Sequence, residues 1–316
     1  MSDRKKVFVI DSVHPVLMDR LSAAGYQIVD AVSWDKKLLL EKLQDAFGII
    51  IRSKFTLDAS FLENAPNLKF IARSGSGLEN IDQNYCFLKN IHLFNSPEGN
   101  RNAVAEQALG MLLSLMNNVQ KSNQEIKSGL WLREENRGEE LDGKTVGIIG
   151  YGNNGQAFAR KLKGFDVRIL VYDKYKSNFG DNQIIESNIE QLMQEVDVLS
   201  FHIPLTDETR HWANEAFFDS LQRSIYFLNL SRGEVVEANA LISAIKNGKV
   251  KGAALDVLEF EPKSFESFFN QKLPQSFYEL LNFPNVIMTP HIGGWTKESY
   301  YKLSNVLADK ILATDF

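Results

Sequence analysis

The chain has 316 residues, 44% of them hydrophobic and 24% charged, which is ordinary for a globular protein and enough for about two domains with separate cores. Its net charge of −5 argues against a large non-specific affinity for nucleic acid or an anionic membrane, and no apolar stretch approaches the ~18 residues of a membrane span. The single cysteine, Cys86, excludes an intrachain disulfide and the five histidines have no metal-binding spacing, so we expect a cytoplasmic protein without a metal site.

The first hundred residues alternate short apolar runs with amphipathic segments, which predicts a parallel α/β sheet. The runs lie near residues 7–10, 26–29, 48–51, 68–72 and 91–94, with helices expected from Pro15 and over 36–43. Turn residues from Ser96 to Asn100 then give way to the apolar segment 103–116, where we place the crossing to a second domain. This segment is predicted to be a helix, either entirely in the core or partly in a subunit interface.

A second α/β series begins at Lys144 and predicts a doubly wound sheet. Its strands are expected near residues 144–149, 167–172, 196–201, 224–230, 252–255 and 286–288, with helical patterns such as 153–164 and 238–246 between them. Residues 295–313 are expected to form one terminal helix that returns to the first domain. The segment 263–283 indicates no function.

A glycine-rich loop follows the first strand of the second series. The sequence Gly150-Tyr-Gly152-Asn-Asn-Gly155 comes directly after an apolar run and opens a helix, the context in which three glycines bind a dinucleotide. Asp173, at the end of the next strand, is placed to accept hydrogen bonds from the adenosine ribose and to repel a 2′-phosphate. We therefore expect NAD, with NADP as the less favoured alternative because two lysines follow Asp173.

Three side chains in the second half of the chain have the chemistry to act on a small anionic 2-hydroxy or 2-oxo acid. They are Arg232 in Asn229-Leu-Ser-Arg-Gly233, Glu261 in Asp256-Val-Leu-Glu-Phe-Glu-Pro262, and His291 in Pro290-His-Ile-Gly-Gly294. A fixed cation binds the carboxylate and polarises the carbonyl of such an acid, and a group titrating near neutrality exchanges the hydroxyl proton. Each residue also has a purely structural alternative. Arg232 could be an ion-paired surface arginine, Glu261 a glutamate in a solvated turn, and His291 a histidine in a loop.

Further motifs occur in a set order along the chain. They are Arg73-Ser-Gly-Ser-Gly-Leu-Glu-Asn-Ile-Asp82, Asn95-Ser-Pro-Glu-Gly-Asn100, Val104-Ala-Glu106, Leu141-Asp-Gly-Lys-Thr-Val-Gly-Ile-Ile-Gly150, His202-Ile-Pro-Leu-Thr206, Gly252-Ala-Ala-Leu-Asp-Val257 and Thr289-Pro-His-Ile-Gly-Gly294. With the three catalytic candidates, they make the chain resemble the D-isomer-specific 2-hydroxyacid dehydrogenase family, and within it the phosphoglycerate dehydrogenase branch, from about Ile50 to Ala308.

This resemblance implies two doubly wound α/β lobes around a cleft. A flavodoxin-like substrate-binding lobe would comprise residues 1–97 and 292–316, and a Rossmann NAD-binding lobe, residues 98–291, would be inserted between them. Arg232 would hold the substrate carboxylate, His291 would exchange the C2 hydroxyl proton, and Glu261 would orient the histidine ring. The implied cofactor contacts are Ser76, Gly150, Gly152, Asn153, Asn154, Gly155, Asp173, His202, Ile203, Pro204, Leu230, Ser231, Asp256, Gly293 and Gly294.

Positive charge indicates the substrate. The glycine-rich turn Arg73-Ser-Gly-Ser76-Gly77-Leu78 predicts an anion-binding concavity for the carboxylate, with a plain turn as the alternative. By the resemblance, Arg52 and Arg73 face a substrate phosphate, and Arg133 is donated across a homodimer formed near residues 101–140. Three cations favour the oxidation of 3-phosphoglycerate to 3-phosphohydroxypyruvate, a step of serine biosynthesis. Each arginine is alternatively a solvated surface residue, and glyoxylate or hydroxypyruvate reductase is the alternative activity.

Two departures from the family pattern affect these expectations. Asn153 and Asn154 replace an arginine and an isoleucine, which predicts weaker or shifted NAD binding. Trp295 stands where a small residue is common, and its bulk is expected to restrict the substrate. A different class of function is an NADH-sensing protein like the corepressors of this family, which would bind NADH without turnover. Formate oxidation is disfavoured because that branch has glutamine where Glu261 stands.

Overall fold

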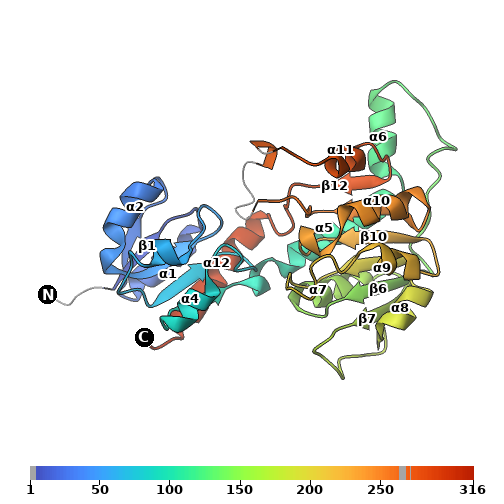
Figure 1. The fold of residues 1–316 in the computed structure, drawn as a ribbon. Coiled ribbons are helices and arrows are strands. Elements are labelled where there is room, and N and C mark those ends of the chain that lie inside the picture. Colours follow the sequence, from blue (N-terminus) through green and yellow to red (C-terminus); the bar gives the residue numbers. More distant parts are fainter. Residues whose placement is uncertain (1–4, 263–267, 271) are drawn as a thin grey trace. The chain divides into compact units, whose positions relative to one another are not determined.

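A computed structural model describes residues 5–262, 268–270 and 272–316 of the chain. The described residues divide into two compact units (Figure 1). Unit 1 contains residues 5–101, 262 and 294–316, and unit 2 contains residues 102–261, 268–270 and 272–293. Part of the segment to which the sequence assigned no function, residues 263–267 and 271, lies outside the described residues.

Unit 1 is built on a five-stranded parallel sheet. Its strands are β1 (Lys6–Val9), β2 (Gln27–Asp30), β3 (Ala46–Ile51), β4 (Phe70–Arg73) and β5 (His92–Asn95), in the order β2-β1-β3-β4-β5. This is the flavodoxin-like order, in which the chain leaves β1 toward one edge and returns to its other side at β3. The predicted doubly wound α/β fold of this part of the chain is confirmed.

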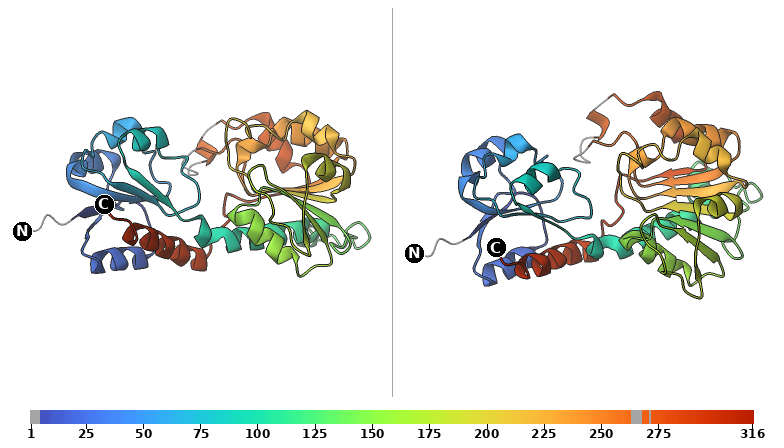
Figure 2. Two further views of the ribbon diagram at one scale, coloured as in Figure 1. Left: turned by 90° about the horizontal axis from the view of Figure 1, so that it is seen from below. Right: turned by 60° about the horizontal axis from the view of Figure 1, so that its bottom comes forward.

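Helices cover both faces of this sheet because successive side chains of each strand point to opposite sides. They are α1 (Pro15–Ala23), α2 (Lys36–Lys42), the 3₁₀ turn η1 (Leu43–Asp45), α3 (Ala59–Leu62), α4 (Gln83–Leu88) and α12 (Lys297–Leu312). Ile49 and Ile51 of β3 belong to a core with α2, α3 and α4, whereas Ile50 lies in a core with α1 and α12. Helix α12 runs beside α1, so the C-terminal helix completes unit 1 (Figure 2).

The segment Ser96–Asn100 corrects one expectation. We predicted a turn there, but helix α5 (Pro97–Met116) already begins at Pro97. Proline is well suited to the first helical position because its missing N–H would have no intrahelical partner. Gly99 lies inside this helix, and only glycine fits there because a Cβ would lie 2.6 Å from the backbone nitrogen of Leu303 in α12. The glycine therefore serves close packing of two helices.

Unit 2 contains a seven-stranded parallel sheet. Its strands are β6 (Thr145–Ile149), β7 (Arg168–Tyr172), β8 (Ile184–Glu186), β9 (Val198–Phe201), β10 (Ile225–Asn229), β11 (Val250–Leu255) and β12 (Val286–Met288), in the order β12-β11-β10-β9-β6-β7-β8. The order reverses between β6 and β9, as in a Rossmann fold, and the predicted fold class is confirmed. The sequence did not predict β8, a three-residue edge strand in which only Ile184 is buried.

The remaining helices pack on this sheet or extend from it (Figure 1). They are α6 (Val119–Lys127), α7 (Asn153–Leu162), α8 (Ile189–Glu195), α9 (Glu215–Ser220), the 3₁₀ turn η2 (Gly233–Val235), α10 (Ala238–Lys246), the 3₁₀ turn η3 (Phe268–Asn270) and α11 (Gln275–Leu281). One core joins the sheet to α5 and α7, and a second joins it to α8, α9 and α10. Across the described ranges, no helix combines the length and apolarity that crossing a membrane requires.

Candidate active site

Arg232 lies just beyond the carboxyl end of β10, in a turn fixed by the last residue of that strand. The Asn229 side chain is buried, and its Oδ1 accepts hydrogen bonds from the amide and the hydroxyl of Ser231 at 3.0 and 2.7 Å. Its Nδ2 donates to the carbonyl oxygen of Arg232 at 2.9 Å. A guanidinium nitrogen of Arg232 donates back to the Ser231 carbonyl at 2.6 Å. The turn is therefore rigid, and the arginine is placed by its own backbone.

The next residue brings this turn against the segment that carries Glu261. A Cβ at Gly233 would lie 2.0 Å from the carbonyl oxygen of Leu258, so only glycine permits this approach. Oε1 of Glu261 accepts a hydrogen bond from the Leu258 amide at 2.6 Å. Its other oxygen, Oε2, lies 2.7 Å from Nδ1 of His291. Two residues that are 30 positions apart are thus held in direct contact.

His291 has a left-handed backbone conformation, with φ of 53°. This region is uncommon for residues other than glycine, and residues held in it cluster at functional sites. The conformation is held by the His291 amide, which lies 2.8 Å from the Asp256 carbonyl oxygen and 3.0 Å from that of Thr289. Because Nδ1 is directed to the carboxylate, Nε2 is the ring nitrogen to which the predicted proton exchange is assigned.

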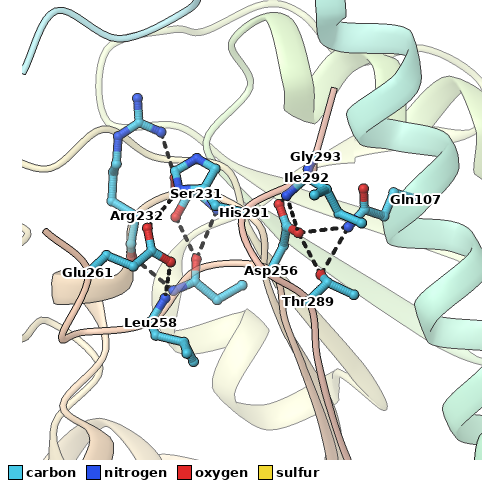
Figure 3. A network of polar contacts seen from close by, with 11 residues as sticks. Gln107, Ser231, Arg232, Asp256, Leu258, Glu261, Thr289, His291, Ile292 and Gly293 are labelled. Atoms are coloured by element: carbon cyan, nitrogen blue, oxygen red, sulfur yellow. Dashed lines mark hydrogen bonds and ion pairs between the residues drawn. The ribbon is translucent and has the colours of Figure 1, made fainter. Parts of the chain in front are cut away.

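Asp256, at the carboxyl end of β11, organises the chain that follows His291 (Figure 3). Its Oδ1 accepts hydrogen bonds from Gln107, Thr289 and the Ile292 amide at 2.8, 2.5 and 2.9 Å, and Oδ2 accepts one from the Gly293 amide at 2.7 Å. Burial raises the pKa of this carboxyl, although these hydrogen bonds act in the opposite direction. The structure therefore gives Asp256 a role in shaping the histidine loop, while its contact with a nicotinamide carboxamide stays a prediction.

The glycine loop has the geometry of a pyrophosphate cradle. Gly150 has φ of 94°, and a Cβ at Gly155 would lie 2.0 Å from the Gly150 carbonyl oxygen, so helix α7 packs tightly against the turn. A Cβ at Gly152 would meet no atom within 4 Å, which leaves open space over the start of the helix. The N-cap residue of α7 is Gly152, which has no side chain to cover the first amides of the helix. The N-terminus of a helix favours an anion.

A cavity of about 470 Å³ lies beside this loop, at the point where the strand order reverses. It is lined by Ile149, Gly150, Gly152, Tyr172, Asp173, Lys174, Tyr175, His202, Ile203, Pro204, Thr206, Glu208, Thr209 and Trp212. Burial lowers the pKa of His202 to about 4, so its ring is neutral near pH 7. Nε2 lies 2.9 Å from the Ser200 hydroxyl, and within the described ranges Nδ1 has no hydrogen-bond partner. An open cradle and an unpaired buried nitrogen both fit a nucleotide.

Charged groups around this cavity fit NAD better than NADP. Asp173 uses Oδ2 to accept the Tyr151 amide at 2.6 Å and Oδ1 to accept the amides of Tyr175 and Lys176 at 2.9 and 3.0 Å. Its carboxylate therefore borders the cavity in a fixed position. Lys174 forms an ion pair with Glu208, and Lys176 donates to the Tyr151 carbonyl at 2.8 Å. Both lysines are engaged locally, so they offer little to a 2′-phosphate.

The two asparagines of the loop are placed at the start of α7. Oδ1 of Asn154 is buried and, among the residues described, has no hydrogen-bond partner. A buried acceptor without a partner costs about 1–3 kcal/mol, a cost that an apolar residue at this position would not carry. The departure from the family pattern therefore has a structural counterpart, and the predicted weakening of NAD binding stays a prediction.

In unit 1, Arg73 has a role that the sequence did not predict. We expected it to face a substrate phosphate, but it is 9% exposed and its guanidinium donates to the carbonyl oxygens of Arg52 and Gly77 at 3.1 and 3.0 Å. A Cβ at Gly75 would lie 2.6 Å from the same guanidinium. Arg73 therefore holds two loops together, and a contact with substrate stays a prediction.

The glycine-rich turn after Arg73 presents free amides. Those of Ser74 and Gly75 donate to Ile51 and Arg73 carbonyls, whereas those of Ser76, Gly77 and Leu78 have no acceptor in the described part of the chain. The turn is held by Asn95, whose Nδ2 donates to the Ser76 carbonyl at 2.6 Å, and by the Ser76 hydroxyl, which donates to Asn100 at 2.8 Å. Gly294 also packs on Asn100. Successive amides of this kind can bind an anion, and binding of the substrate carboxylate by this turn stays a prediction.

Several residues that shape the site were missed as functional residues. Asn229 and Thr289 stand inside motifs that the sequence displayed, but neither was given a role. Gln107 was also given no role, and its position beside Glu106 in a largely apolar part of α5 carries no signal that would have singled it out. Arg133, another predicted substrate residue, is exposed after α6.

The fold and the glycine loop define a dinucleotide-binding α/β protein, and comparison with known proteins gives its family. Residues 109–293 match the family described as "D-isomer specific 2-hydroxyacid dehydrogenase, NAD binding domain". The chain is 33% identical over 287 residues to glyoxylate reductase from Pyrococcus furiosus, a match covering 88% of this chain and 82% of the relative. It is 32% identical over 309 residues to D-3-phosphoglycerate dehydrogenase from Methanocaldococcus jannaschii, covering 97% of this chain but only 56% of that protein.

Among solved structures, the chain is similar to D-lactate dehydrogenase from Aquifex aeolicus, which was determined with NAD and lactic acid. The TM-score is 0.83 and the identity 27%, and the match covers 98% of this chain and 94% of the other. The chain therefore belongs to the D-isomer specific 2-hydroxyacid dehydrogenase family, NAD-dependent oxidoreductases that act on CH–OH groups. Its relatives act on different acids, so family membership alone leaves the substrate open.

Proposed function

We propose that the chain is an NAD-dependent dehydrogenase that interconverts a D-2-hydroxy acid and its 2-oxo acid. The observation that carries this proposal is the contact of 2.7 Å between Glu261 and His291, in a segment packed against the turn of Arg232. A carboxylate, an imidazole and a guanidinium are the groups that this reaction needs, and all three follow the carboxyl ends of strands in the sheet that binds the nucleotide.

The roles of these groups follow from their chemistry. Bound NAD supplies a hydride acceptor for the C2 hydrogen of the hydroxy acid and, in its reduced form, a hydride donor. Arg232 binds the substrate carboxylate and polarises the C2 oxygen through its planar set of N–H donors. Nε2 of His291 accepts the C2 hydroxyl proton during oxidation and returns it during reduction. Glu261 keeps the ring oriented and stabilises the positive charge that the ring acquires.

The preferred substrate pair in this proposal is 3-phosphoglycerate and 3-phosphohydroxypyruvate. Arg52 lies directly after β3, and free amides of Ser76, Gly77 and Leu78 follow β4, so unit 1 offers one cation and one amide cluster for anionic groups. The buried Arg73 supports this region by holding its loops. Unphosphorylated glyoxylate or hydroxypyruvate is the alternative substrate, in keeping with the similarity to glyoxylate reductase.

A panel of 2-oxo acids tests this proposal. NADH oxidation by the purified chain is followed at 340 nm with phosphohydroxypyruvate, hydroxypyruvate, glyoxylate and pyruvate. The proposal expects kcat/KM to be highest for phosphohydroxypyruvate. A higher value for glyoxylate or hydroxypyruvate would instead support a reductase of those acids. Tight NADH binding without turnover of any acid would contradict dehydrogenase activity and support an NADH-sensing role.

We also propose that the chain forms a homodimer through α6 and the residues that follow it. Val119, Ile126, Leu130 and Trp131 are exposed there, and Trp131 is 78% exposed. A concavity of about 240 Å³ is lined by Trp131, Arg133 and neighbouring residues. Apolar surface of this kind is typical of a protein interface. Sedimentation of the wild type and of Trp131→Asp tests the proposal, which expects a dimer that the variant weakens.

A further inference from the structure

The sheet of unit 1 has its own ligand-binding position. In an open α/β sheet, ligands bind beyond the carboxyl ends of the strands where the strand order reverses. In the order β2-β1-β3-β4-β5 this point lies between β1 and β3. Asp11 follows the end of β1 and Arg52 follows the end of β3, so these two residues flank it. The topology therefore marks Arg52 independently of any substrate assignment.

The backbone of Arg52 is fixed from both sides. Oδ2 of Asp11 accepts hydrogen bonds from the amides of Arg52, Ser53 and Lys54 at 3.1, 2.7 and 2.9 Å. On the carbonyl side, Arg73 and Asn80 donate to the Arg52 oxygen at 3.1 and 3.2 Å. These hydrogen bonds fix the backbone of Arg52 but leave the direction of its side chain open.

Trp295 determines that direction. The Arg52 Cζ atom lies 4.2 Å from the centroid of the Trp295 ring and 5.8 Å from that of Tyr300. Both aromatic residues belong to unit 1, as does Arg52. In the described ranges, the guanidinium of Arg52 forms no ion pair and donates no hydrogen bond. Stacking occupies the face of the guanidinium and leaves its edge of N–H donors available for a planar or tetrahedral oxyanion.

We propose that Trp295 is a positioning residue that holds Arg52 ready to bind a second oxyanionic group of an acid substrate. The stack reduces the number of side-chain conformations that binding must freeze, so it favours acids with a second anionic group over acids with an uncharged end. This inference rests on the proposed dehydrogenase function for its substrate class. It assigns selectivity to a bulky residue that the sequence indicated only as a steric restriction.

Binding of substrates without turnover provides the test. Isothermal titration of the full chain, with NADH present so that the bound hydroxy acid cannot be oxidised, measures Kd for 3-phosphoglycerate, D-malate and D-glycerate, whose far ends carry a phosphate ester, a carboxylate and a hydroxyl. Trp295→Ser is expected to weaken 3-phosphoglycerate about two- to fivefold, the effect of losing one exposed cation–π contact, and to leave D-glycerate unchanged. If Trp295→Ser weakens D-malate binding to the same extent, the site also accepts carboxylates. If the affinity for D-malate does not change, the site is restricted to phosphate esters.

Matched variants separate positioning from general damage. Trp295→Phe keeps a ring and is expected to retain most of the affinity, whereas Phe87→Ser removes an exposed aromatic of unit 1 that has no contact with Arg52. Arg52→Gln should weaken 3-phosphoglycerate about 10- to 100-fold, and adding Trp295→Ser to it should have no further effect. The proposal is wrong if Trp295→Ser weakens D-glycerate equally, or if its effect persists beside Arg52→Gln.

The same titrations distinguish the two proposals. Suppose that Trp295→Ser selectively weakens 3-phosphoglycerate binding, but that the wild type reduces none of the 2-oxo acids with NADH. This result would support the positioning role and reject the dehydrogenase function. If the wild type reduces 2-oxo acids but Trp295→Ser weakens all three hydroxy acids equally, the dehydrogenase function is supported and the positioning role is rejected. A wild type that binds none of the three acids would overturn the positioning role.

Discussion

The Glu261 carboxylate lies 2.7 Å from Nδ1 of His291, and its other oxygen accepts the Leu258 amide. The residue thus holds the histidine ring and its own backbone turn at once. Glu261→Gln preserves the shape but removes the charge opposite the ring. Because a charge-assisted hydrogen bond contributes about 1 kcal/mol more than a neutral one, we expect kcat to fall about fivefold. Steady-state NADH oxidation with the preferred 2-oxo acid measures this.

His291→Ala removes the group that exchanges the proton. We expect kcat to fall about 10²- to 10⁴-fold, the usual contribution of general acid–base catalysis. NADH binding, measured by fluorescence titration, should stay close to the wild-type value because the nucleotide cavity is not lined by His291. If His291→Ala lost NADH binding and turnover together, His291 would be a structural residue and the proposed mechanism would fail.

Two glycines of the loop should differ in what their replacement by alanine changes: protein stability at Gly155 and NADH affinity at Gly152. Gly155→Ala places a Cβ 2.0 Å from the Gly150 carbonyl oxygen, so α7 must move and the free energy of unfolding should fall by about 1–3 kcal/mol. Gly152→Ala meets no protein atom within 4 Å, so stability should be unchanged while NADH binding weakens. Urea unfolding and NADH titration of both variants check this. Full NADH affinity in Gly152→Ala would show that the open space is not the pyrophosphate cradle.

The close approach at Gly233 is a further test of how the site is assembled. Gly233→Ala would bring a Cβ within 2.0 Å of the Leu258 carbonyl oxygen and push the Arg232 turn away from the Glu261 segment. We expect a loss of about 1–3 kcal/mol in stability and a large fall in kcat. Gly110→Ala is the matched control, since its Cβ meets nothing within 4 Å in helix α5 and should stabilise the chain by about 0.5–1 kcal/mol. Wild-type kcat in Gly233→Ala would contradict this assembly.

Sequence patterns predicted the fold because most strands are buried apolar runs with a clear beginning and end. Strand β8 escaped because an edge strand with one buried residue leaves no such pattern. The turn residues Pro97 and Gly99 were misleading, since they serve helix initiation and close packing within α5. At Gly99, the contact that explains the residue comes from the distant helix α12, which the local sequence does not reveal.

Residue type indicated the candidate catalytic groups, but not the network that positions them. The contact of Glu261 with His291 was expected from the resemblance, whereas the acceptors and donors around Asp256 and Asn229 depend on three-dimensional neighbours. The stacking of Arg52 on Trp295 is likewise invisible in sequence, because 243 positions separate the two residues. Chemistry is readable from residue type, and orientation comes from packing.

His202 predicts how stability depends on pH. Its pKa is lowered by burial from an ordinary 6.5 to about 4, so between these values the unfolded chain binds a proton that the folded chain does not. The stabilising contribution is therefore complete above about pH 6.5 and is lost as the pH falls toward 4, by up to about 3 kcal/mol. His202→Gln keeps a polar side chain opposite Ser200 but cannot titrate. Urea unfolding at pH 7.0, 5.5 and 4.5 should show a smaller loss of stability in this variant than in the wild type. Equal losses in both chains would mean that the acid sensitivity comes from other groups.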